Sequence, residues 1–228
     1  MKKLAALAAL LAAPALGQTP KTEDEKTLYA VGLAVSRELS VFTLSPSELE
    51  LVKKGITDGV LGKKTAVELQ AYQQKVQELA QARRKASGEK ASVAGKEFLD
   101  KAAKEKGAVK TDSGLVYVSL LEGNGPSPTD KDTVKVNYRG TLTNGTEFDA
   151  SASHGGPAEF PLSGVIKCWT EGVQKMKVGG KARLTCPPAI AYGERGAGGA
   201  IPPSSTLVFE IELLEVKKAE APEAKKAQ

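Results

Sequence analysis

The stretch L-V-F-E-I-E-L-L, residues 207–214, decides the fold of the second half of the chain. Its odd-numbered positions are apolar, whereas Glu210 and Glu212 face the other way along an extended chain. This alternation is typical of a strand with one buried and one solvated face. L-V-Y-V-S-L at 115–120 and T-V-K-V-N-Y at 133–138 are also rich in strand-forming residues. The second half is therefore predicted to contain an antiparallel sheet.

A hairpin and a short helix complete the predicted domain. T-N-G-T at 143–146 predicts a tight turn, because Asn-Gly readily adopts the positive φ angles that hairpins need. Trp169, Val173 and Met176 fall at i, i+4 and i+7, and V-G-G at 178–180 ends this helix. One helix covering the apolar face of an antiparallel sheet is an α+β arrangement.

The first half, from Thr22 to about Lys106, predicts helices. T-E-D-E, S-P-S-E and T-A-V-E, beginning at Thr22, Ser45 and Thr65, each place a hydroxyl at a possible N-cap and a carboxylate three residues later. The third segment contains no proline, and its two glycines, at 88 and 95, weaken the helix without ending it. If continuous, this helix would be about 60 Å long at about 1.5 Å per residue.

The long helix cannot fold back on itself, and the two shorter helices, which carry an apolar stripe, cannot cover it fully. A second copy of the chain is the predicted partner, so we expect a homodimer through the N-terminal helices. The alternative is a monomer with a solvated, charge-rich connecting helix. The stripe consists of Leu28, Val31, Val35, Leu39, Leu49, Val52 and Ile56.

The N-terminus resembles an export signal. Lys2 and Lys3 precede an Ala/Leu run, and Ala15 and Gly17 suit cleavage before Gln18. Removing residues 1–17 lowers the formal charge from +5 to +3. Charges interrupt every later apolar run, so we expect no stable membrane insertion. The remaining basic residues are interleaved with acidic ones, which argues against nucleic-acid binding, and the expected location is the periplasm, with the outer-membrane surface or secretion as alternatives.

Conventional catalytic groups are scarce. The one histidine, His154, lies in a Gly-rich loop without a G-x-S-x-G elbow, and we interpret it as an exposed loop residue. One histidine and two distant cysteines do not make a zinc site. G-E-R-G-A-G-G-A, residues 193–200, leads into prolines and not into a helix, which argues against a phosphate cradle. We expect no metal and no cofactor.

The two cysteines, Cys168 and Cys186, are too far apart in sequence for a C-x-x-C redox motif. Cys186 shares strand parity with Ala182 and Leu184, which points it inward. In an oxidising compartment a structural disulfide is the favoured interpretation. The alternative is a pair of small buried hydrophobic residues.

Ordered motifs of the second half match a known family. They are V-N-Y-R-G-T-L, N-G-T-E-F-D-A-S, F-P-L-S-G-V-I-K-C-W-T-E-G-V, I-A-Y-G-E-R-G and I-P-P-S-S-T-L-V-F-E-I-E-L-L. In this order and spacing, over residues 115–216, they resemble the FKBP-type peptidyl-prolyl cis-trans isomerases. The exported helical first half is similar to the Mip-like and FkpA-like members, which are dimeric isomerases with chaperone character.

The resemblance implies four segments and a fold. They are a signal peptide at 1–17, a helical dimerisation and chaperone region with a long connecting helix at 18–107, an FKBP-type isomerase domain at 108–216 and a flexible tail at 217–228. The implied fold is α+β, with a C-terminal antiparallel sheet wrapped on one short helix after an all-α N-terminal region. The implied substrates are proline-containing, unfolded or partly folded polypeptides, and tacrolimus-type macrolides are implied inhibitors.

The resemblance also implies a site. Trp169 would form the floor of a proline pocket, Tyr192 and the Ile166 N–H would each hold a substrate carbonyl, and Asp149 would order the polar edge. Ala158, Ala197 and Ala200 stand where larger residues are common in the family, and Cys168 where glycine is common. The implied catalytic residues are Tyr138, Phe148, Asp149, Trp169, Tyr192 and Phe209, and the implied substrate-binding residues are Phe160, Val165, Ile166 and Ile201.

Two functions of different classes are consistent with such an apolar cleft. The first is an isomerase acting on exported, partly folded chains. The second is a holdase that binds clients through the same cleft without turnover. The complete set of implied catalytic residues favours the isomerase.

Overall fold

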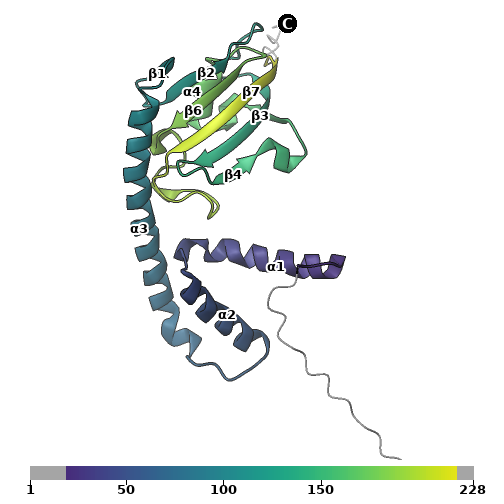
Figure 1. The fold of residues 1–228 in the computed structure, drawn as a ribbon, viewed down its shortest axis with the longest axis vertical. Coiled ribbons are helices and arrows are strands. Elements are labelled where there is room, and N and C mark those ends of the chain that lie inside the picture. Colours follow the sequence, from purple (N-terminus) through teal and green to yellow (C-terminus); the bar gives the residue numbers. More distant parts are fainter. Residues whose placement is uncertain (1–18, 220–228) are drawn as a thin grey trace, which may run out of the picture. The chain divides into compact units, whose positions relative to one another are not determined.

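The computed structural model describes residues 19–219, so the signal peptide expected at 1–17 lies outside the described residues. The chain divides into two compact units, one ending at Glu38 and one beginning at Leu39. The first unit holds nearly all of helix α1, Glu23–Leu39. The second unit holds the other helices and the sheet (Figure 1).

Two of the three predicted helix starts are confirmed. Thr22 Oγ1 accepts a hydrogen bond from the Glu25 amide at 3.2 Å, and the Glu25 carboxylate accepts one from the Thr22 amide at 3.0 Å. Helix α2, Pro46–Val60, follows Ser45, which forms a capping box with Glu48. In each case local side chains satisfy amides that the first helical turn leaves unpaired.

The third predicted start is wrong. Helix α3, Leu69–Ala102, begins after Glu68, which makes no side-chain cap, and not at Thr65. Arg83 of α3 pairs with Glu48 of α2, so the chain must return from the end of α2 before α3 begins. The residues between the two helices form this connection in place of an additional helical turn.

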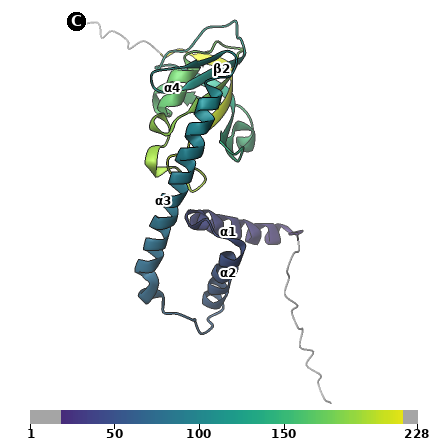
Figure 2. The same ribbon diagram turned by 60° about the vertical axis from the view of Figure 1, so that its left-hand side comes forward.

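Helix α3 is continuous through Gly88 and Gly95, and both are buried. A Cβ atom on Gly88 would lie 3.1 Å from Cβ of Pro203, and one on Gly95 would collide with the side chain of Thr206. The glycines therefore permit a close approach between α3 and residues 203–206. The C-terminal part of α3 lies beside the sheet in both views (Figures 1 and 2).

The sheet has the strand order β1-β2-β6-β7-β3-β4, and all of its recorded pairings are antiparallel. Strand β5 pairs with the first part of β3, on the same edge that β4 occupies further along. The strands are β1 Ala108–Lys110, β2 Val116–Leu121, β3 Thr133–Leu142, β4 Glu147–Ala150, β5 Ala158–Pro161, β6 Lys181–Cys186 and β7 Leu207–Lys217. Short 3₁₀ helices occupy Ser40–Phe42 (η1), Ser151–His154 (η2), Leu162–Gly164 (η3), Pro188–Ile190 (η4) and Gly193–Arg195 (η5).

Helix α4, Lys167–Val173, packs on the apolar face of the sheet. It ends earlier than predicted, although Met176 is still only 2% exposed, because a hydrogen-bonded turn carries the chain on into the core. A Cβ on Gly172 would lie 2.5 Å from Leu184, so the helix approaches β6 closely. The core thus lies between α4 and the sheet.

The predicted hairpin joins β3 to β4. Gly145 has φ +85°, and the Asn144 side chain accepts a hydrogen bond from the Thr146 amide at 3.0 Å. Asn144 itself does not adopt a positive φ, so one residue of the Asn-Gly pair supplies the left-handed conformation.

The first residues of the expected tail contact the domain. Lys217 ends β7, and its ammonium contacts Glu159 at 2.6 Å. Asp132, 2% exposed, accepts hydrogen bonds from the Thr129 amide, Lys218 Nζ and the Ala219 amide, and these bonds lower the pKa of its carboxyl. Residues 217–219 are therefore attached to the domain, and the remainder of the expected tail lies outside the described residues.

The contact between α3 and Thr206 predicts a position-specific loss of stability. Gly95→Leu should lower the free energy of unfolding by about 1–3 kcal/mol, because the new side chain overpacks this contact. Urea unfolding followed by the fluorescence of the single tryptophan measures the change. Ala94→Leu introduces the same side chain at the neighbouring exposed position and should change stability by no more than about 0.5 kcal/mol. Equal effects of the two substitutions would contradict the assignment.

Candidate functional site

One open pocket of about 280 Å³ brings together residues from four strands, one helix and two loops. Nine of the ten residues that the sequence analysis placed in the site line it, and Gly164 lines it as well. The nine are Tyr138 on β3, Phe148 and Asp149 on β4, Phe160 on β5, Val165 and Ile166 before α4, Trp169 on α4, Tyr192 between η4 and η5, and Phe209 on β7.

Trp169 lies at the centre of the aromatic part of this pocket. Its ring contacts those of Tyr138 at 5.3 Å, Phe209 at 5.4 Å and Phe160 at 5.6 Å between centroids, each edge to face. Aromatic pairs prefer this geometry because the positive edge of one ring meets the negative face of the other. Trp169 is 5% exposed, so its indole belongs to the core and the pocket at once.

Gly140 on β3 creates room for two other rings. A Cβ at this position would lie 2.6 Å from Phe148 and 2.9 Å from Phe209. Phe148 and Phe209 contact each other edge to face at 5.6 Å. The absence of a side chain at Gly140 therefore lets one wall of the pocket lie directly on the sheet.

The polar edge of the pocket is built around Asp149. Tyr138 Oη donates a hydrogen bond to Asp149 Oδ2 at 2.7 Å, and His154 Nε2 lies 2.8 Å from Asp149 Oδ1. Burial opposes ionisation of Asp149, but these two contacts outweigh it and lower the pKa of its carboxyl. Burial, followed by the bond to Asp149, raises the pKa of Tyr138. At neutral pH the edge therefore holds one carboxylate and one neutral phenol.

Two donors remain available at the pocket. Burial and the negative charge of Asp149 raise the pKa of Tyr192, so its hydroxyl keeps its proton at neutral pH. Ile166 is the N-cap residue of α4, and its carbonyl accepts hydrogen bonds from the amides of Trp169 and Thr170. Neither the Tyr192 hydroxyl nor the Ile166 amide is hydrogen-bonded within residues 19–219.

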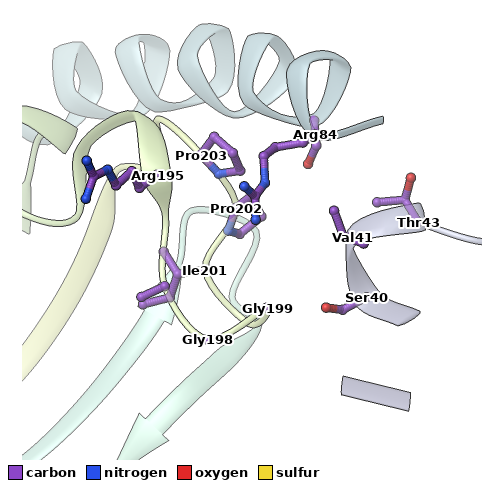
Figure 3. A pocket seen from close by; sticks show the side chains of 12 residues that line it. Ser40, Val41, Thr43, Arg84, Arg195, Gly198, Gly199, Ile201, Pro202 and Pro203 are labelled. Carbon is purple, nitrogen blue, oxygen red and sulfur yellow. The ribbon is translucent and has the colours of Figure 1, made fainter. Parts of the chain in front are cut away.

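Ile201, the tenth expected site residue, does not line this pocket. It is 7% exposed within the core, and it pairs with Ala197 across the loop before β7. Ile201 instead lines a neighbouring pocket of about 110 Å³ between this loop and residues 40–43 (Figure 3). Arg84 and Arg195 also line that pocket, but their side chains do not converge on one point (Figure 3).

The cysteines lie behind the pocket. Cys168 on α4 and Cys186 at the end of β6 are joined by a disulfide, with their Cα atoms 5.8 Å apart, and both are fully buried. Cys168 directly precedes Trp169, so the covalent link is adjacent to the pocket floor.

Sequence reasoning missed two polar residues beside Asp149. His154 is exposed as predicted but also contacts the carboxylate, and Ser151 Oγ accepts a hydrogen bond from the Tyr138 amide at 3.1 Å. Their sequence signal is their nearness to Asp149. The turn through η2 that directs His154 back toward β4 is not visible in the residue pattern.

Within residues 19–219, no three His, Cys, Asp or Glu side chains are grouped so that they could hold a metal ion. No helix in the same range is long and apolar enough to cross a membrane.

Family models match both halves of the chain. Residues 125–214 match the model for the FKBP-type peptidyl-prolyl cis-trans isomerase, and residues 24–118 match the model for the domain amino terminal to it. Among solved structures, FkpA from Escherichia coli has a TM-score of 0.65 at 41% identity, covering 88% of this chain and all of that one. An isomerase from Pseudomonas syringae has a TM-score of 0.53 at 38% identity, covering 57% of this chain and 96% of that one.

Two relatives are similar in sequence to nearly the full length of this chain. FkpA of E. coli K12 is 42% identical over 217 residues, covering 90% of this chain and 80% of the relative. The peptidyl-prolyl cis-trans isomerase Mip of Coxiella burnetii is 37% identical, covering 92% of this chain and 94% of the relative. The chain therefore belongs to the FKBP-type peptidyl-prolyl cis-trans isomerases, in the FkpA and Mip-like group.

Proposed function

We propose that the pocket around Trp169 is where this isomerase binds the proline ring of its substrates and turns the preceding peptide bond. The observation that supports this most strongly is the convergence of nine of the family-implied residues on one cavity. A proline ring is apolar and compact, and it suits a pocket walled by rings that meet edge to face.

The chemistry needs neither a nucleophile nor a metal. Rotation about a peptide bond has a barrier of about 18–20 kcal/mol because resonance holds the amide planar. The twisted transition state loses this resonance and has less charge separation than the planar amide. A dry aromatic pocket therefore favours the twisted form over the strongly hydrated planar one.

Positioned donors would hold the chain on both sides of the rotating bond. The Tyr192 hydroxyl and the Ile166 amide are unpaired donors at the pocket, and each would bind one substrate carbonyl. Asp149 would keep Tyr138 in place as a wall by accepting the hydrogen bond from its hydroxyl. Binding the flanking carbonyls orders the substrate before the peptide bond rotates. Less entropy is then lost on reaching the twisted geometry.

Removal of either polar group should slow isomerisation. Tyr192→Phe deletes one donor to the substrate, and a single hydrogen bond contributes about 0.5–1.5 kcal/mol. We expect kcat/KM on a short X-Pro peptide to fall by about 2- to 10-fold. Asp149→Ala should also slow the reaction, because Tyr138 loses its acceptor.

Tyr117→Phe is the matched control, since it removes a phenol hydroxyl on β2 in the same domain but outside the pocket. Its kcat/KM should equal that of the wild type. If wild type itself gives no acceleration but suppresses aggregation of an unfolded client, the holdase replaces the isomerase as the function of the cleft.

The enzyme is further proposed to act outside the cytoplasm on exported, partly folded chains, with chaperone activity. The N-terminal sequence supports export through cleavage before Gln18, and similarity to FkpA supports a periplasmic location. The same pocket is the proposed binding site for tacrolimus-type macrolides, and Ala197 and Ala200 stand in the loop before β7 where the family commonly has larger residues.

A homodimer through the helical region is proposed from its uncovered apolar side chains. Within the described chain, many large apolar residues of the helices are more than 40% exposed. Monomeric proteins rarely leave apolar patches of this kind in water, so a second copy of the chain is the proposed partner. The exposed apolar residues of the helices include Leu28, Val31, Leu51, Ile56, Val60, Leu69, Val76 and Leu79.

Light scattering of residues 18–228 at micromolar concentration should give twice the mass of one chain. Leu51→Glu should shift the protein toward one-chain mass, because Leu51 is 72% exposed and a buried charge opposes an apolar interface. Val109→Glu, on strand β1 and 53% exposed, should leave the mass unchanged. A mass of one chain for the wild type would refute the dimer.

The Cys168–Cys186 disulfide is proposed to stabilise the domain by holding α4 against β6. Closing a loop of this length contributes about 3 kcal/mol on the chain-entropy model. The double variant Cys168→Ser/Cys186→Ser should therefore unfold at a lower urea concentration than the oxidised wild type. Two free thiols in the native, unreduced protein would contradict this role.

A further inference from the structure

The contact between His154 and Asp149 was not anticipated from the sequence. His154 is the last residue of η2, and its imidazole Nε2 lies 2.8 Å from Asp149 Oδ1. The His154 side chain is 61% exposed and that of Asp149 is 41% exposed, so water and protons reach the pair freely. The histidine is thus at the rim of the pocket, outside the aromatic walls.

The same carboxylate connects this rim to the pocket floor. Asp149 Oδ2 accepts the hydrogen bond from Tyr138 Oη, and the Tyr138 ring contacts that of Trp169 at 5.3 Å. Whatever fixes the orientation of Asp149 also fixes the Tyr138 hydroxyl. The contacts thus run from His154 through Asp149 and Tyr138 to Trp169 in the proposed pocket.

Among residues 19–219, three titratable side chains face Asp149. They are Tyr138 from β3, Tyr192 from the loop after η4, and His154. Arg139, adjacent to Tyr138 on β3, is paired with Glu147 at 2.7 Å. The two tyrosines are neutral at physiological pH, so His154 is the group beside the carboxylate whose charge a protonation can change.

We propose that His154 is a positioning residue whose protonation sets the activity of the isomerase by fixing Asp149 and, through it, Tyr138. The inference rests on the proposed pocket. As an imidazolium, His154 forms a charge-assisted hydrogen bond, which is about twice as strong as a neutral one. As neutral imidazole it holds the carboxylate less firmly, and Tyr138 loses part of its orientation.

The direction of the pH dependence follows from the histidine alone. An imidazole carries a positive charge at lower pH and loses it at higher pH, so the charge-assisted hydrogen bond is present on the acidic side. Because the pKa of Asp149 is lowered, that carboxyl stays ionised throughout this range. kcat/KM should therefore be about 2- to 5-fold higher at pH 6 than at pH 8 at low salt, and the ratio should shrink as salt screens the exposed pair.

The experiment uses tag-free residues 18–228, since His154 is the single histidine of the chain. A test peptide without ionisable side chains isolates the titration of the enzyme. NMR of the imidazole gives the pKa of His154 directly, and the midpoint of the activity profile should coincide with it. Tryptophan fluorescence checks that every variant is folded at each pH.

Two variants separate charge from bulk. His154→Arg carries a permanent positive charge and should be active and independent of pH between 6 and 8. His154→Gln keeps a neutral polar group and should be slower and equally flat. A wild-type profile without a slope, or a slope that persists in His154→Gln, would overturn the inference.

The outcome also distinguishes this inference from the proposal on which it rests. Active wild type with a flat profile refutes the role of His154 and leaves the proline pocket intact. Wild type without activity at any pH refutes the pocket as a catalytic site, and the positioning role with it.

Discussion

The packing of Trp169 against three other rings is the interaction on which the rest of the domain depends. Helix α4 has only two turns, so its position comes from side-chain packing and not from its own helical stability. The indole contacts β3, β5 and β7 through Tyr138, Phe160 and Phe209. The same contacts that bury the helix also shape the floor of the pocket. The stability of the domain and the shape of the proposed proline pocket therefore depend on the same ring contacts.

This shared use explains why the site contains so little ionisable chemistry. An aromatic core that opens at one edge needs polar groups only at that edge, where Asp149, Tyr192 and Ile166 line the proposed proline pocket. The indole N–H of Trp169 is buried without an acceptor in the described part of the chain. Burying a hydrogen-bond donor without a partner lowers the free energy of unfolding by about 1–3 kcal/mol. Packing around the ring must offset this cost.

Much of the fold could be predicted from the sequence because its signals are local. The alternation at 207–214 gives the face of β7, and the Ser45 and Thr22 boxes give two helix starts without reference to the rest of the chain. Thr65 carries the same local signal, yet the helix begins later because the connection from α2 to α3 decides its start. The residue pattern does not show how many residues the chain needs to connect α2 to α3.

The features that the sequence could not predict depend on contacts between distant segments. Asp132 accepts hydrogen bonds from Lys218 Nζ and the Ala219 amide across more than 80 residues, which the composition of the C-terminal segment does not indicate. The role of His154 depends on the turn through η2. Nine of the ten expected site residues line one pocket, whereas Ile201 lies in the core beside the loop before β7.

The contacts of Gly88 and Gly95 with residues 203–206 fix the direction in which helix α3 leaves the sheet domain. About 26 residues separate Gly95 from the start of the helix at Leu69, which corresponds to about 39 Å at about 1.5 Å per residue. A tilt of about 10° where Gly95 meets Thr206 would move the far end by about 7 Å. The absence of a side chain at Gly88 and Gly95 therefore helps to set the direction of α3. An added methyl group at either position would tilt the helix and displace its N-terminal end by a larger distance.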